Sequence, residues 1–424
     1  MIEAPSKEIR KVYILFSLLL GFLSGVGMDG LLIIITVFFL MYSLIKYPQY
    51  CMLSWLIIYP FLNSKSSILS VALLAIVCVV YIVRYWILKK VLLNEFVGYI
   101  FIFLCAVISY LLGQKPEMYA LVIFAFVLII FLNFKKYTEE NKFGHIVLAF
   151  DYCALGIIVS VILGIMLKND SIVHNGRLAF SDNVKTMAEL IVIPLFFRMI
   201  ALLEGKTLFS CQKKRILDYI YLLTLGICLI LTVSRGTIIA LMAALGFYAI
   251  LNHKKMRNFL FILGTIIGGI LIIVILYERL VEWGFLANIE GLNGRTDIWA
   301  FYYEKYKSYG VENIIFGVGP GNINRLAVGE RYGRYYIHSV IVDSLVTYGL
   351  VGFSVLVVTF YRAFVKGIRL KDTLRLSMLL LCFCMFLTHG NINYRLFYVM
   401  IGFLSASNVI YSNKNYSVDK ESDF

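Results

Sequence analysis

Residues 144–167 read GHIVLAFDYCALGIIVSVILGIML, a run of 24 residues with Asp151 as its only carboxylic acid. Apolar and polar residues do not alternate along this run, as they would in a strand of a membrane barrel. A helix of this length spans the hydrocarbon core of a bilayer, which is about 30 Å thick. Helices and closed barrels are the structures that satisfy their backbone polar groups in hydrocarbon. The stretch therefore predicts a membrane-spanning α-helix.

The rest of the chain repeats this pattern. Hydrophobic residues make up 61% of the 424 residues and the mean hydropathy is +0.86, against roughly 45–50% apolar residues in soluble domains. A water-soluble protein is excluded. We predict an all-α integral membrane protein, a polytopic helical bundle of about 12–14 transmembrane helices, and the run at 49–62 is short enough to be re-entrant or interfacial. The other apolar runs are 11–27, 28–46, 67–88, 96–113, 117–134, 187–204, 216–233, 236–251, 257–277, 338–361, 374–388 and 395–411.

Basic residues are unevenly divided between the loops on the two sides of the membrane. If the N-terminus is inside, the cytoplasmic segments carry 24 Lys and Arg and the short outer loops carry 7. This bias predicts that both ends of the chain are cytoplasmic. It also explains most of the net charge of +14, so we expect no nucleic acid partner.

One outer segment is much longer than the others. Residues 278–337 form a loop of sixty residues with seven basic and seven acidic side chains. Within it, residues 296–309 are expected to form an amphipathic helix that lies on the membrane or over the bundle, with Thr296 as its N-cap. Its apolar stripe is predicted to be Trp299, Tyr302, Tyr303 and Tyr306.

The charge pattern and the long loop divide the chain into five parts. We predict N-terminal transmembrane helices, core transmembrane helices, the large extracytoplasmic loop, C-terminal transmembrane helices and a cytoplasmic tail. These parts are residues 1–143, 144–277, 278–337, 338–411 and 412–424.

Several arginines are expected on the outer face. Arg235 lies in Ser234-Arg235-Gly236, where one span ends and the next begins. A guanidinium beside the free N–H groups of a helix N-terminus is a typical anion site. The alternative is an interfacial arginine that only ends a helix. Arg177 lies in the loop of residues 174–183 and, taken alone, would be an ordinary exposed residue. Arg295 opens the predicted loop helix and could reach back over the bundle.

His338 stands where the long loop re-enters the membrane. A neutral imidazole at this boundary can accept a proton from a hydroxyl group, and the alternative is an interfacial histidine. Asp343 follows about 140° around the helix, so no orienting role is assigned to it. Asp343 and Asp151 are carboxylic acids inside apolar spans and are weaker functional candidates. His389 and Arg395 are predicted to lie at a different outer turn and to cap it.

Two further patterns are interpreted as structural. Residues 317–322 read GVGPGN, which lacks the Lys-Ser/Thr of a phosphate-binding loop and predicts a tight turn.

None of the eight cysteines falls in a predicted outer loop, and no CxxC pair occurs. We expect no metal and no cofactor.

The order of the motifs resembles the bacterial O-antigen ligase and polymerase superfamily. The matching pieces run from about residue 145 to 365, and the first 140 residues match only as unspecific spans. The pieces are Gly176-Arg177 with Asp182-Asn183, Thr232-Val233-Ser234-Arg235-Gly236, Gly294-Arg295-Thr296-Asp297-Ile298-Trp299, Phe316-Gly317-Val318-Gly319-Pro320-Gly321-Asn322, and His338-Ser339.

The resemblance implies a metal-independent membrane glycosyltransferase of the C-type architecture in the bacterial cytoplasmic membrane. Its donor would be an undecaprenyl-diphosphate-linked oligosaccharide, and its partners membrane lipids, a flippase and chain-length regulators. The catalytic residues implied are His338, Arg235 and Arg177. The substrate-binding residues implied are Arg295, Ser234, Gly236, Asn183, Trp299 and Gly319.

Three activities remain open. The ligase motif has Gly, two residues, Gly and two threonines after the histidine. Gly349 and Gly352 fit this spacing, but Phe353 and Ser354 replace the threonines. This difference favours a polymerase of repeat units for O-antigen, capsule or exopolysaccharide over a ligase. A transporter or flippase of the same lipid-linked sugars is the alternative of another class.

Overall fold

The computed structural model describes most of the chain. The described residues are 7–63, 67–83, 94–113, 117–139, 143–174, 177–179, 184–203, 215–252, 264, 291–308, 310–321, 337–387, 389–390 and 394–406. Almost all of them are helical, which confirms the predicted all-α membrane fold. Six helices within these ranges are long and apolar enough to cross a membrane, namely α1, α2, α6, α7, α8 and α15.

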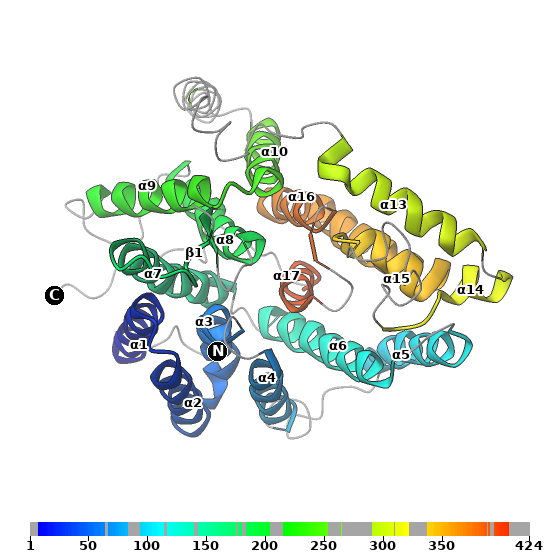
Figure 1. Ribbon diagram of the computed structural model, residues 1–424, viewed down its shortest axis with the longest axis horizontal. Coiled ribbons are helices and arrows are strands. Elements are labelled where there is room, and N and C mark those ends of the chain that lie inside the picture. The colour runs from blue at the N-terminus through cyan, green and yellow to red at the C-terminus, as the bar shows by residue number, and fades with distance from the viewer. Residues whose placement is uncertain are drawn as a thin grey trace. The chain divides into compact units, whose positions relative to one another are not determined.

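The chain forms two compact units (Figure 1). Unit 1 comprises residues 1–88, 140–285 and 411–424. Its elements are α1 (Lys7–Val26), α2 (Asp29–Lys46), η1 (Pro48–Tyr50), α3 (Cys51–Asn63), α4 (Ser67–Ile82), α7 (Phe143–Met166), β1 (Val173–His174), β2 (Arg177–Leu178), α8 (Val184–Leu203), α9 (Arg215–Leu231) and α10 (Arg235–Leu251).

Unit 2 comprises residues 89–139 and 286–410. It combines two helices from the first third of the chain with the C-terminal helices, a grouping that sequence order does not reveal. Its elements are α5 (Asn94–Leu112), α6 (Met118–Glu139), α13 (Gly291–Ser308), α14 (Val311–Phe316), α15 (Val340–Arg369), α16 (Thr373–Leu387) and α17 (Arg395–Leu404).

Close helix packing in unit 1 depends on small residues. A Cβ atom on Gly21 of α1 would lie 2.1 Å from the carbonyl oxygen of Gly156 in α7, so the two backbones touch. Farther along the same contact, Ser160 donates a hydrogen bond of 3.2 Å to Ser24. In a membrane, where lipid competes equally for apolar side chains, close backbone approach and such bonds hold helices together.

The short run at 49–62 forms α3, which lies in the interior of unit 1. The side chains of Trp55, Leu56, Ile57 and Ile58 are fully buried. A helix that is apolar on every side belongs in the interior of a bundle. The thirteen residues of α3 rise only about 20 Å, which is less than the thickness of the hydrocarbon core; a re-entrant or interfacial position of this segment stays a prediction.

Unit 2 is organised around a break in α15. Gly349 has φ 64° and ψ −162°, which interrupts the helix. The carbonyl groups of Val346 and Thr347 accept hydrogen bonds from the N–H groups of Val318 and Gly319, at 3.0 and 3.1 Å. The segment after α14 therefore supplies donors to carbonyl groups at the break.

Candidate active site

Arg177 is placed by a small hairpin that follows α7. Strands β1 and β2 pair antiparallel, with His174 opposite Arg177. The amide of Asn169 at the start of the hairpin donates to the carbonyl oxygens of Ser24 and Gly25, at 3.2 and 3.0 Å. The hairpin is thus tied to the end of α1, and Arg177 is half-buried at its tip.

Arg235 is placed by a tight reversal between α9 and α10. Val233 takes a left-handed backbone conformation, with φ 54°, and the hydroxyl group of Thr232 donates to the carbonyl oxygen of Leu229 at 2.6 Å. Three residues therefore suffice to turn the chain. Arg235 is the first residue of α10, as the sequence predicts, and its side chain is half-buried.

The two arginines lie in the same part of unit 1, where the charge of Arg177 is felt at the guanidinium of Arg235. Both side chains are half-buried. Like charges repel, and the repulsion grows as water is excluded. An anion bound between the two guanidinium groups relieves this repulsion. The pair therefore has the electrostatics of an anion site.

The neighbouring motif residues have mixed outcomes. Ser234 is the N-cap residue of α10, but its hydroxyl group bonds to that of Thr237 at 2.9 Å rather than to a backbone N–H group. Gly236 is half-buried in the first turn of α10. Asn183 lies outside the described residues. A substrate contact of Ser234, Gly236 or Asn183 stays a prediction.

His338 lies at the junction between the long loop and α15. Its backbone is left-handed, with φ 51°, and its side chain is half-buried. Ser339 caps α15 by accepting a hydrogen bond of 3.2 Å from the N–H group of Val342. The indole N–H group of Trp299 donates to the carbonyl oxygen of Ile337 at 2.8 Å. The backbone is therefore held on both sides of His338.

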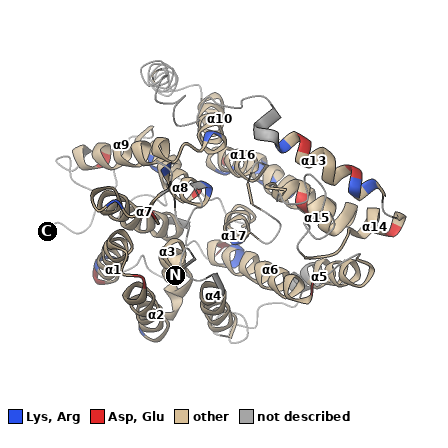
Figure 2. Ribbon diagram, viewed as in Figure 1, with Lys and Arg blue, Asp and Glu red and all other residues tan. Residues whose placement is uncertain are grey.

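Helix α13 differs from the prediction in its start and in its buried face. It begins at Gly291, so Thr296 is an exposed interior residue and the predicted N-cap is wrong. On the buried face, Ile298, Tyr302 and Tyr306 pack against other residues of unit 2, including Ile337. Tyr303, which was predicted to belong to this face, is 46% exposed. Figure 2 shows acidic and basic residues along α13, unlike the long apolar helices.

This packing places α13 over the bundle within unit 2. The hydroxyl group of Tyr306 donates to the carbonyl oxygen of Ile314, and burial raises the pKa of that hydroxyl. Arg295 lies near the N-terminal end of α13, one turn before Trp299, and is half-buried. Arg295 and His338 therefore belong to segments that pack together. A substrate-binding role for Arg295 and Trp299 stays a prediction.

The glycine-rich segment is a turn, as predicted. Gly317 and Gly319 have φ 85° and 95°, a region that glycine adopts without strain. A Cβ atom on Gly317 would lie 2.2 Å from the carbonyl oxygen of Thr347. Because the N–H group of Gly319 bonds to Thr347, that donor is used within the protein. Contact of Gly319 with substrate stays a prediction.

The turn between α16 and α17 lies next to the start of α15. A Cβ atom on Gly390 would lie 3.0 Å from the Cγ2 atom of Val340, so the turn between α16 and α17 lies beside the His338 junction. The rings of His389 and Tyr394 are 5.3 Å apart in this turn. His389 thus lies in a different turn from His338, as predicted, and this turn lies next to the start of α15; a capping role for His389 and Arg395 stays a prediction.

Both carboxylic acids inside apolar spans have partners. Asp343 accepts a hydrogen bond of 3.1 Å from the hydroxyl group of Thr347. Asp151 forms a bidentate ion pair with Arg198 of α8, and the Arg198 Nε to Asp151 Oδ1 distance is 2.9 Å. Both members of this ion pair are buried. Sequence analysis did not find Arg198, because a single arginine in an apolar run gives no hint of its partner.

The described residues contain no cluster of three or more His, Cys, Asp or Glu side chains that could hold a metal ion. The candidate residues of unit 1 supply the guanidinium groups of Arg177 and Arg235, and those of unit 2 supply the imidazole of His338 and the guanidinium of Arg295. These groups bind anions and transfer protons.

Comparison with known proteins identifies one matching family. The model described as O-antigen ligase matches residues 220–357, which include Arg235, Arg295, Trp299, Gly319 and His338. No curated protein matches the chain. The match supports the O-antigen ligase and polymerase superfamily, the same resemblance that the sequence motifs carry, and it does not separate a polymerase from a ligase.

Proposed function

We propose that this protein is a membrane glycosyltransferase that polymerises undecaprenyl-diphosphate-linked oligosaccharide repeat units on the outer face of the bacterial cytoplasmic membrane. The match of residues 220–357 supports an activity of the O-antigen ligase or polymerase type. The choice of donor is supported by the location of Arg177 and Arg235 in one part of unit 1, where both side chains are half-buried, because two guanidinium groups suit a diphosphate.

In this proposal Arg177 and Arg235 hold the diphosphate of the donor. Each guanidinium can donate two parallel hydrogen bonds to phosphate oxygens. As the bond between the anomeric carbon and the diphosphate breaks, negative charge grows on the leaving group. Fixed positive charges at that point stabilise the transition state. The arginines can do this work without a metal ion.

His338 activates the acceptor. The hydroxyl oxygen of the acceptor sugar attacks the anomeric carbon of the donor, its proton passes to the imidazole, and undecaprenyl diphosphate leaves with the bonding electron pair. General base catalysis requires a neutral imidazole held in position. The bond from Trp299 to Ile337 and the Ser339 cap give the backbone around His338 a defined conformation.

The exposed side of α13 offers surfaces for sugar rings. Tyr303 is 46% exposed, and the ammonium group of Lys307 lies 4.9 Å from the centre of its ring. Aromatic faces pack against the apolar faces of sugars, and neighbouring charged groups donate hydrogen bonds to hydroxyl groups. We assign this face and Arg295 to binding of the oligosaccharide.

Two other activities compete with polymerisation. A ligase would pass the finished chain to a lipid or cell-wall acceptor, using the same donor. A transporter of lipid-linked oligosaccharides would use ionisable groups inside the membrane, and the ion pair of Asp151 and Arg198 is the feature that favours it. A polymerase is preferred because Phe353 and Ser354 replace the two threonines of the ligase motif.

The test is reconstitution of the purified protein in liposomes with an undecaprenyl-diphosphate-linked repeat unit. A polymerase makes products of two and more repeat units and releases undecaprenyl diphosphate, both of which mass spectrometry detects. Transfer only to an added lipid acceptor would identify a ligase. Movement of the intact donor across the bilayer without a new glycosidic bond would identify a transporter and refute the proposal.

A further inference from the structure

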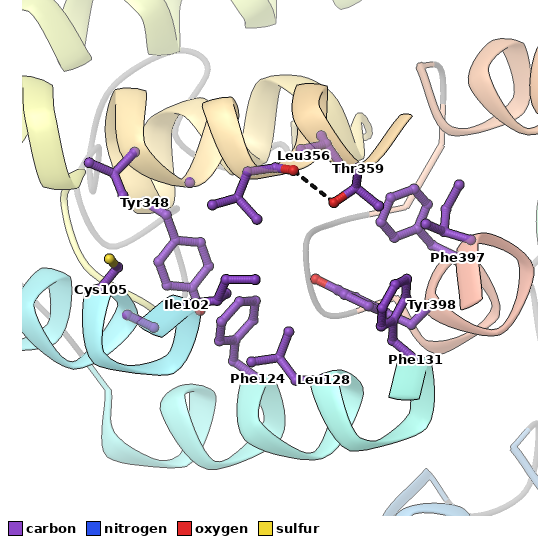
Figure 3. Close-up of a pocket in the computed structure, with 15 residues that line it drawn as sticks. Ile102, Cys105, Phe124, Leu128, Phe131, Tyr348, Leu356, Thr359, Phe397 and Tyr398 are labelled. Carbon is purple, nitrogen blue, oxygen red and sulfur yellow. Dashed lines mark hydrogen bonds between the residues drawn. The ribbon is translucent and has the colours of Figure 1, made fainter. Parts of the chain in front are cut away.

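A groove in unit 2 runs along one face of α15, beside α5 and α6. Its wide part has a volume of about 810 Å³. A narrower cavity of about 80 Å³ shares the lining residues Val351, Val355 and Thr359 with it. Figure 3 shows the narrow part, where the ring of Tyr348 points from α15 towards Phe124 of α6, with ring centres 4.6 Å apart. The two cavities therefore adjoin along this face of α15, and together they are called the groove.

The groove is nearly as long as the bilayer is thick. Its lining positions on α15 recur every three or four residues from Tyr348 to Lys366. From Leu350, just after the break at Gly349, to Lys366 the helix rises about 24 Å, and the hydrocarbon core measures about 30 Å. Val351, Val355 and Val358 supply apolar walls along it. A groove of this length and composition fits hydrocarbon chains.

The two ends of the groove differ in charge. Lys135, Arg362 and Lys366 line the wide end, where the ammonium group of Lys366 lies 3.4 Å from the carbonyl oxygen of Ser405. Glu139, 3.9 Å from Lys135, offsets one of these three charges. The narrow end is lined by the neutral rings of Tyr348 and Tyr398. The basic end is the one that the charge bias predicts to be cytoplasmic.

We propose that this groove binds one anionic glycerophospholipid of the cytoplasmic leaflet. Its acyl chains lie along Val351 and Val355, and its phosphate lies between Lys135, Arg362 and Lys366. A zwitterionic lipid would bring its own ammonium group to the basic end. A polyprenyl donor with its diphosphate at the outer face would leave this basic end without an anion. Charge therefore selects an anionic lipid of the inner leaflet.

Native mass spectrometry of the purified protein with added phosphatidylglycerol tests this site. The parent protein is expected to retain one tightly bound phosphatidylglycerol and to bind phosphatidylcholine more weakly. The double variant Arg362→Gln, Lys366→Gln should weaken phosphatidylglycerol binding by roughly 30-fold. The reason is that each basic residue near an anionic headgroup adds to the binding affinity. Arg369→Gln with Lys371→Gln is the matched control, because both side chains are exposed and neither lines the groove.

A second pair of variants tests the apolar walls without changing charge. Val358→Trp should block the groove and displace the lipid. Val357→Trp, at a position 47% exposed and outside the groove, should not. The proposal would be overturned if the parent protein bound phosphatidylcholine and phosphatidylglycerol with equal affinity. It would also be overturned if the double variant in the groove and its matched control lost phosphatidylglycerol affinity equally. Displacement of phosphatidylglycerol by undecaprenyl phosphate, with no effect of the charge variants, would instead assign the groove to the donor tail. Inorganic phosphate should not compete.

Discussion

The substitution Gly349→Ala tests how the break in α15 is held. A Cβ atom at this position would lie 2.4 Å from the carbonyl oxygen of Ile315 and 2.5 Å from the backbone nitrogen of Gly317. Both contacts are with backbone, which cannot move aside as the end of a flexible side chain can. The left-handed φ of 64° costs an alanine about 1–2 kcal/mol by itself.

Relief of these contacts would separate α15 from the segment that follows α14. The bonds from Val318 to Val346 and from Gly319 to Thr347 would then be lost or stretched, at roughly 0.5–1.5 kcal/mol each. The total cost is about 2–5 kcal/mol. Because the break is close to the start of α15, which follows His338 directly, activity should fall together with stability.

Thermal unfolding of the purified protein in detergent measures the effect. Gly349→Ala should lower the melting temperature by several degrees. Gly246→Ala is the control, since nothing lies within 4 Å of its added Cβ atom in α10 and alanine is the better helix former. Equal melting temperatures for Gly349→Ala and the parent protein would mean that the described packing at the break contributes no stability.

Four further predictions concern charge, chemistry and topology. Arg235→Lys keeps the charge but loses the bidentate geometry, so it should lose most activity at normal expression, and full activity would reduce Arg235 to a helix-end residue. His338→Ala should lower the rate of bond formation by about 10²–10⁴-fold with donor affinity near that of the parent, and an unchanged rate would exclude it as the base. Arg198→Met should lower the free energy of unfolding by about 3–5 kcal/mol, because Asp151 is left buried without its ion pair. In an Asp151→Asn background, the same substitution should lower it much less. A reporter fused after Lys305 should lie outside the membrane, and a cytoplasmic signal there would refute the predicted topology.

The positions of the membrane helices could be predicted from sequence because length and apolar composition are local properties. The runs at 144–167 and 187–204 correspond to α7 and α8 to within a few residues. The start of α10 at Arg235 was also predictable, since an arginine and a glycine interrupt an apolar run there. The motif order was enough to suggest the superfamily that the match of residues 220–357 supports.

Partners far apart in the chain were decided by the tertiary structure. The pairing of Asp151 with Arg198 and the bond from Trp299 to Ile337 each depend on which helices become neighbours. An apolar run specifies that a segment enters the membrane, but many helix arrangements bury apolar surface equally well in lipid. Close backbone approach and polar pairing select among those arrangements, and these depend on the whole fold.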